Sequence, residues 1–278
     1  MDDQLRRRSV GAPAARSVLL TILGEFLLPN GSEVWHGTLV TALSDLGYTV
    51  QAARQALARS VSAGWLRTER QGRRARVRLT DEAAAMLRRG AARIYTFGDP
   101  WEWDGNWLLV ALRVPERRRD VRHRVRTQLA WQGFGSLGGG LWISPHGERE
   151  RELLGVDRES GAELITFRGE LGGLGNLDDV ISEAWDLDDV AANYDDFVKT
   201  FSRRRPGQAD AIFRAHTELV HAWRRFPFLD PDLPPDLLPP RWPQTRALSL
   251  FRDRRAEWQA TAKFHFLQIE HAAEETVD

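Results

Sequence analysis

The stretch TVQAARQALARSVSAGWLRTERQGRRARVRLT, residues 49–80, decides how the N-terminal part of the chain folds. Its first half places Ala53, Leu57 and Val61 four residues apart. Apolar residues at such spacing are typical of one buried face of a helix. The sequence therefore predicts a helix over about 50–63, with these three side chains pointing inward.

The second half of the stretch has a different period. After Gly64, polar and apolar residues alternate over 65–70 and again over 75–80, as they do in half-buried strands. Gly72 and the two arginines after it lie between the two runs and predict the tip of a β-hairpin.

Three further helices complete this region. Apolar residues recur at helical spacing over 16–28 and 35–46, and a fourth helix is expected to begin after Thr80. Three helices followed by a two-stranded hairpin is the order of a winged helix-turn-helix. We therefore predict a DNA-binding domain over 1–95.

Eight arginines lie within residues 49–80. In a helix-turn-helix the third helix enters the major groove, where arginine can pair with guanine and glutamine with adenine. Arginines at the hairpin tip can reach the flanking backbone. The alternative is that arginine simply solvates an exposed helix and hairpin. The predicted DNA-contacting residues are Thr49, Gln51, Arg54, Gln55 and Arg59 on the helix and Arg73, Arg74 and Arg76 on the hairpin.

Charge and composition fit an intracellular partner of negative charge. The formal net charge is zero, but residues 1–90 carry 14 basic and 8 acidic side chains, whereas 151–200 carry 4 and 13. Such asymmetry indicates an anionic partner for the N-terminal part alone.

The absence of cysteine excludes disulfides and thiolate metal sites. No apolar run suits a membrane span or a signal peptide. We expect a cytoplasmic protein.

The middle and the end of the chain follow other patterns. Strand-like runs at 104–116, 141–144 and 162–171, with a helix at 117–133, suggest a ferredoxin-like domain over 96–185. Later residues are helical apart from a proline-rich crossing, and they predict a helical domain over 186–278. The expected fold class is α+β with three domains.

Two motifs that resemble catalytic or binding sites are set aside. His216 and His221 are five residues apart with Glu218 between them, whereas helical zinc sites need histidines four apart. GSLGGGLW, residues 135–142, lacks the lysine and hydroxyl residue of a phosphate loop and is interpreted as a turn. We expect no metal, no cofactor and no catalytic residue.

Four segments give the chain a family resemblance. They are ARQALARSVSAGWLRTERQGRRARVRLT, RIYTFGDPWEWDGNWLLVALRVPE, GFGSLGGGLWISPH and HAWRRFPFLDPDLP. In this order they resemble the PaaX family, bacterial repressors of phenylacetate catabolism, along nearly the whole chain. The resemblance implies a homodimer that binds a palindromic operator in double-stranded DNA and is released by an acyl-CoA such as phenylacetyl-CoA. A regulator of another pathway, with a different effector or none, is the alternative.

The central region also resembles the small ferredoxin-like nuclease of CRISPR adaptation. That enzyme needs an aspartate at the end of its first strand to hold a divalent cation. Here Leu112, Arg113 and Val114 occupy the place, and an arginine repels the metal. A metal-dependent nuclease is therefore the less favoured hypothesis.

An effector pocket would have to come from the central and C-terminal regions. Tryptophans can form walls for an aromatic acyl group, and an arginine can hold phosphates. The alternative is that these tryptophans are core residues and the arginines are solvated. The candidate effector-binding residues are Trp107, Arg113, Trp131, Trp142 and Trp223.

Overall fold

The structure, a computed structural model, describes residues 13–31, 33–153 and 161–275. These residues form two compact units. Unit 1 comprises Met1–Arg93, Arg203–Ala222 and Phe251–Asp278, and unit 2 comprises Ile94–Ser202 and Trp223–Leu250. The basic N-terminal tail, including Arg6, Arg7 and Arg8, lies outside the described residues.

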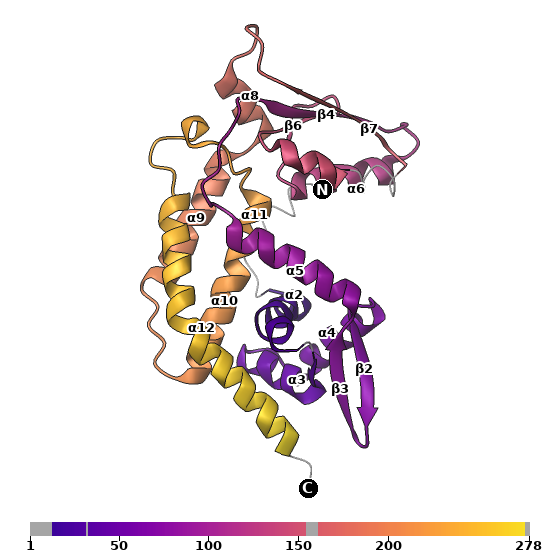
Figure 1. Ribbon diagram of the computed structural model, residues 1–278, viewed down its shortest axis with the longest axis vertical. Coiled ribbons are helices and arrows are strands. Elements are labelled where there is room, and N and C mark those ends of the chain that lie inside the picture. The colour runs from indigo at the N-terminus through magenta and orange to yellow at the C-terminus, as the bar shows by residue number, and fades with distance from the viewer. Residues whose placement is uncertain (1–12, 32, 154–160, 276–278) are drawn as a thin grey trace. The chain divides into compact units, whose positions relative to one another are not determined.

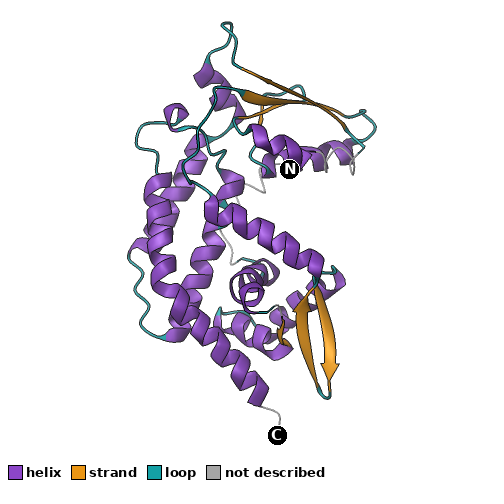
Figure 2. Ribbon diagram, in the orientation of Figure 1, coloured by secondary structure: helices purple, strands orange, loops and turns teal. Residues whose placement is uncertain are grey.

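Unit 1 begins with helices and a small sheet (Figures 1 and 2). Its elements are α2 (Ala15–Ile22), a π-helical turn (Leu23–Leu27), a 3-10 turn (Leu28–Asn30), β1 (Glu33–Trp35), α3 (His36–Asp45), α4 (Val50–Ser62), β2 (Leu66–Gln71), β3 (Arg74–Leu79) and α5 (Asp81–Thr96), whose last turn belongs to unit 2. The predicted helices and the hairpin are all present, while β1 was not expected. It joins the hairpin in an antiparallel sheet of order β1-β3-β2.

The core of unit 1 joins distant parts of the chain. Phe26 of the π-helical turn stacks on Phe266 of α12 (Gln244–Glu275), with ring centroids 5.2 Å apart. It also contacts Phe213 of α10 (Ala209–Trp223) in a tilted arrangement, with ring centroids 5.1 Å apart. All three rings are almost fully buried. Two C-terminal helices therefore pack on the N-terminal helices and contribute to one core with them.

Unit 2 contains a four-stranded sheet with helices. Its elements are β4 (Trp107–Arg113), α6 (Arg119–Trp131), β5 (Gly135–Ser136), β6 (Leu141–Ser144), a 3-10 turn (Gly147–Arg149), β7 (Glu163–Gly169), α8 (Leu177–Ala184), α9 (Leu187–Ser202), α11 (Phe226–Leu229) and a 3-10 turn (Pro235–Leu237). The antiparallel strand order is β5-β6-β4-β7, so β6 and β4 are the inner strands. The three expected strands are present, while the short strand β5 was not expected.

The two faces of this sheet carry different clusters. On one face Leu108 and Val110 of β4 pack with Val121, Val125 and Leu129 of α6, all buried. On the other face, Trp107 and Ile143 pack with Ile181 of α8. The alternation of β4 side chains therefore fixes which residues face α6.

The residues expected to form a separate helical domain, 186–278, are shared between the two units. Among them, α9 and α11 belong to unit 2, whereas most of α10 and α12 belongs to unit 1. Within the described ranges, no helix is both long and apolar enough to cross a membrane.

Candidate functional site

The helix α4 presents a polar outer face. Thr49 caps it, because its hydroxyl oxygen accepts a hydrogen bond from the Ala52 amide at 3.2 Å. The buried side is formed by Ala53, Ala56, Leu57 and Ser60. The polar residues predicted to contact DNA, Gln51, Arg54, Gln55 and Arg59, are all exposed, as is Thr49.

One inward prediction for α4 is wrong. Val61 was expected inside but is 38% exposed. Four residues turn a helix by about 400°, so two such steps from Ala53 move Val61 about 80° away from the buried face. Ala56 and Ser60 occupy that face instead.

The predicted hairpin residues do not share one environment. Gly72 has a positive φ of 64° and forms the tip, followed by the exposed Arg73. In Figure 1 the hairpin of β2 and β3 extends away from α4. Arg74 and Arg76 are half-buried, and each contacts residues near the end of α12. The structure thus separates Arg73 from the other two predicted arginines.

The hairpin also carries exposed arginines that were not among the predicted contacts, namely Arg67, Arg70 and Arg78. Arg67 and Arg78 are paired across the β2-β3 ladder. The strand alternation in the sequence was the signal that could have included Arg67 and Arg78, since it separates them from the buried Leu66, Val77 and Leu79. Arg70 lies on the same side of β2 as Leu66 but near the hairpin tip, opposite Ala75.

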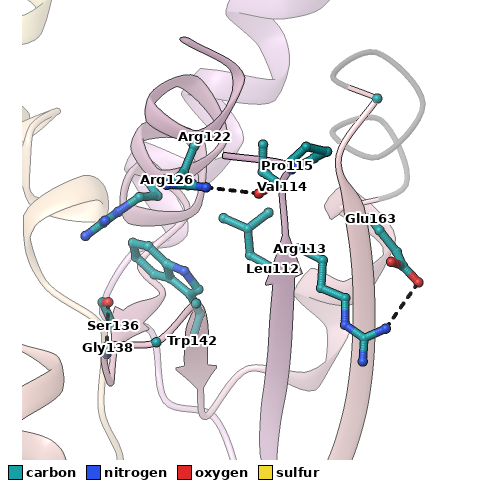
Figure 3. A pocket seen from close by; sticks show the side chains of 13 residues that line it. Leu112, Arg113, Val114, Pro115, Arg122, Arg126, Ser136, Gly138, Trp142 and Glu163 are labelled. Atoms are coloured by element: carbon teal, nitrogen blue, oxygen red, sulfur yellow. Dashed lines mark hydrogen bonds and ion pairs between the residues drawn. The ribbon is translucent and has the colours of Figure 1, made fainter. Parts of the chain in front are cut away.

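A second candidate site is a cavity of about 810 Å³ in unit 2, within the usual size range of small-molecule sites. It lies between the end of β4, α6 and the glycine-rich turn before β6 (Figure 3). Among the described residues, its charged side chains are Arg113, Arg122, Arg126 and Glu163. The lining thus carries an excess of positive charge and suits an anionic ligand.

Each arginine in this cavity is held in a definite way. Arg113 pairs with Glu163 at 3.7 Å across the β4-β7 ladder. Arg122 donates to the backbone carbonyl of Val114 at 3.0 Å. Arg126 lies over the ring of Trp142, 6.0 Å from its centroid, and is exposed.

The glycine-rich turn shapes the cavity. Gly138, Gly139 and Gly140 all have positive φ. A Cβ on Gly140 would lie 2.7 Å from the carbonyl oxygen of Leu112. That close approach is fixed because the Leu112 amide donates to the Gly140 carbonyl at 2.8 Å. The motif is therefore a tight, glycine-dependent turn on a cavity wall.

The five candidate effector residues do not meet in one place. Arg113 and Trp142 line the cavity. Trp107 packs with Ile143 and Ile181 on the sheet face opposite α6. Trp131 is 57% exposed, and its ring contacts that of Phe228. Trp223 is fully buried among aromatic rings. These three do not line this cavity.

The sequence interpretation missed two arginines of the cavity, Arg122 and Arg126. Their spacing of four residues on one helix, beside the buried Val121 and Val125, was the available signal. This spacing places Arg122 and Arg126 on one side of α6, next to the face that packs on the sheet.

The residues of the metal-like motif have separate partners. His216 lies 2.9 Å from Glu25, His221 lies 3.0 Å from the Thr21 hydroxyl, and Glu218 pairs with Arg204. Within the described residues, no group of three or more histidine, aspartate or glutamate side chains is arranged to hold a metal ion. At the end of β4, Arg113 is exposed where the nuclease would need a carboxylate.

A buried acidic cluster in unit 2 holds the proline-rich crossing. The Tyr194 hydroxyl donates to Asp230 at 2.6 Å, and burial raises the pKa of that carboxyl to about 6. His146 lies 3.0 Å from the carbonyl oxygen of Asp232 and 3.2 Å from Glu148. The hydrogen bond from His146 holds the pKa of Glu148 at about 2. These contacts tie α9 and the end of β6 to the crossing.

Comparisons with known proteins agree along the chain. Three family models match in succession: PaaX-like protein at residues 14–83, the PaaX protein central Cas2-like domain at 100–181, and the PaaX-like protein C-terminal domain at 185–268. The transcriptional repressor PaaX of Escherichia coli (strain K12) is 31% identical over 239 residues, covering 81% of this chain and 74% of that protein.

The fold also has a counterpart among solved structures. The uncharacterized protein Rv0674 from Mycobacterium tuberculosis matches 91% of this chain and 99% of its own, with a TM-score of 0.62 and 22% identity. This likeness concerns the fold alone.

Proposed function

The chain belongs to the PaaX family, and on that premise we propose that it is a winged helix-turn-helix repressor that binds operator DNA as a homodimer. We assign it no catalytic activity. The observation that carries the proposal is the face of α4: a capped helix, buried on one side, presents Gln51, Arg54, Gln55 and Arg59 to solvent beside a basic hairpin. These side-chain types can read base edges in the major groove.

In this proposal α4 is the recognition helix and the β2-β3 hairpin is the wing. Helix-turn-helix dimers bind two half-sites about one helical turn apart, so the operator would be palindromic. Arg54 and the two glutamines would contact bases, while Arg59 and Arg73 would contact phosphates. A bacterial repressor meets its operator in the cytoplasm.

We further propose that the cavity of unit 2 receives the effector, an aryl-CoA thioester of the phenylacetyl-CoA type. Arg122 and Arg126 would hold phosphates, because guanidinium groups bind phosphate oxygens in a bidentate manner. Trp142 would flank the bound ligand. Effector binding would change the angle between the two wings of the dimer, so that the half-site spacing no longer fits.

A gel shift tests the proposal. The full-length chain is titrated onto its own upstream promoter duplex at fixed salt, with and without phenylacetyl-CoA. We expect a complex that the thioester releases, whereas free phenylacetate and free CoA do not. Binding that ignores the thioester would support the alternative, a PaaX-type regulator with another effector or none. Cleavage of the duplex in Mg²⁺ or Mn²⁺, abolished by a chelator, would contradict the non-enzymatic assignment.

A further inference from the structure

The wing of unit 1 is tied to the end of α12. In the sheet, Trp35 of β1 is paired with Arg76 of β3, and Glu69 of β2 is paired with Arg76 from the other side. Alternation along β3 puts Arg74 on the same face as Arg76. This face is opposite to the one that buries Val77 in the core.

Two arginines enclose one tryptophan on this face. The guanidinium carbons of Arg74 and Arg76 lie 4.2 and 4.3 Å from the centroid of the Trp35 ring. Trp35 is only 8% exposed. Contacts of this length are cation-π interactions, which strengthen when the groups are shielded from water. Arg74 also donates to the backbone carbonyl of Glu274 at 3.2 Å.

Arg76 lies among three carboxylates. Its guanidinium nitrogens are 3.6 Å from Glu33, 3.5 Å from Glu270 and 3.7 Å from Glu274. Its side chain is 23% exposed, and that of Glu270 is 18% exposed. The side chains of Glu33 and Glu274 are more exposed, at 39% and 57%, so Glu270 is the most shielded partner of Arg76. A network of several charges contributes more than an isolated surface pair.

Glu270 connects this network to the start of α3. Its two carboxylate oxygens accept from the Trp35 amide at 3.3 and 3.1 Å, and one of them accepts from the Thr38 hydroxyl at 2.5 Å. A single carboxylate thus binds the backbone of β1, the first turn of α3 and the wing arginine. Hydrogen bonds to a charged acceptor are the stronger kind.

The local charge disfavours a phosphate at this place. Among the groups in contact within the network, Arg74 and Arg76 contribute two positive charges, while Glu33, Glu270 and Glu274 contribute three negative ones. For Arg76 to bind a DNA phosphate, it would have to leave these carboxylates. Arg73 at the hairpin tip is exposed and lies outside this network.

We propose that Arg74 and Arg76 do not contact DNA but fix the wing to the end of α12, with Glu270 and Glu274 as positioning residues. This positioning role replaces the DNA contacts that the sequence predicted for these two arginines. It rests on the proposed function only in so far as the position of the wing affects operator binding. Because the wing is held by a helix and not only by its own hairpin, its position depends on α12.

The first test compares Arg76→Gln with Arg73→Gln in the full-length chain. Operator affinity is measured by gel shift from low to moderate salt. Loss of one phosphate contact lowers the slope of log affinity against log salt by about 0.9. We expect that loss for Arg73→Gln. For Arg76→Gln we expect affinity about threefold to tenfold weaker with the slope unchanged, since a positioning residue releases no counterion.

The second test needs no DNA. Amide hydrogen exchange of residues 66–79 is followed in the wild type, Arg76→Gln, Glu270→Gln and Arg73→Gln. Glu270→Gln removes the charge but keeps an oxygen that can accept from the Trp35 amide, so it spares the fold better. We expect faster exchange in the hairpin for Arg76→Gln and Glu270→Gln, and wild-type exchange for Arg73→Gln.

The outcomes separate the two proposals. Unchanged hairpin exchange in both Arg76→Gln and Glu270→Gln, or a salt slope that falls for Arg76→Gln as it does for Arg73→Gln, would overturn the positioning role. Absence of any operator binding by the wild type would contradict the proposed function, while the exchange result would still decide the role of the network.

Discussion

Two arginine-rich segments look alike in the sequence and differ in the structure. The hairpin, residues 65–79, holds six arginines, and residues 113–126 hold seven. In the hairpin, Arg76 is surrounded by carboxylates from β1 and α12, while Arg73 stays exposed at the tip. In the second segment, Arg122 and Arg126 line a cavity in which the described lining residues include a single carboxylate, Glu163.

The comparison shows that an arginine's function depends on which acceptors surround it. An arginine already among carboxylates holds protein parts together, whereas one in a cavity with few carboxylates remains suited to an incoming anion. Neither the number of arginines nor their spacing determines this. The acceptors come from distant residues, such as Glu270 for the hairpin.

The largest expected effect concerns the glycine turns of the two regions. Gly140→Ala should cost about 2–4 kcal/mol of unfolding free energy, because its φ of 88° is unfavourable for alanine and its Cβ would meet the Leu112 carbonyl. Gly72→Ala, at φ 64° with nothing within 4 Å of its Cβ, should cost only about 1 kcal/mol. Urea midpoints measure both. Equal losses would show that the cavity turn is no more constrained than the wing tip.

Sequence prediction succeeded for the elements that local patterns define. Helix α4 and the hairpin follow from local periodicity, and β6 was predicted at its observed bounds, Leu141–Ser144. Local patterns suffice there because the period distinguishes a helix from a strand, although Val61 was assigned to the wrong face of α4.

Prediction failed where contacts join distant residues. The wing network pairs Arg76 with Glu270, nearly 200 residues later, and no local pattern links the two. The cavity likewise needed the strand order β6-β4-β7, which brings Arg113 beside Glu163 and the glycine turn. Of the four candidate tryptophans, Trp142 alone is among the described residues that line this cavity.

Arg54→Ala tests the exposed face of α4. We expect operator binding to weaken by about 1–3 kcal/mol, with little change on random duplex, because a bidentate base contact is lost. Gel shifts on both duplexes at one salt concentration measure the difference. Equal losses on the two duplexes would show that Arg54 contacts phosphate, which is the role proposed for Arg73 of the wing.

Arg126→Gln tests the cavity. Affinity for phenylacetyl-CoA, measured by calorimetry, should fall about tenfold, or about 1.4 kcal/mol, while operator affinity without ligand stays unchanged. Arg124→Gln is the matched control: it lies on the same helix, is paired with Asp120 at 3.6 Å and does not line the cavity. If both variants lose affinity alike, the helix acts through its general charge and the cavity is not the site.

Glu163→Gln should have the smallest effect and the opposite sign. The variant removes the only acidic side chain among the described residues that line the cavity and releases Arg113 from its 3.7 Å ion pair. Both groups of that pair are more than 60% exposed, so the gain is limited by solvent screening. We expect phenylacetyl-CoA to bind about twofold to fivefold more tightly at low salt, with the gain disappearing at high salt as screening increases. Weaker binding would mean that Glu163 orients Arg113 for the ligand. In that case a carboxylate-bound arginine would serve binding in the cavity, unlike Arg76 in the wing.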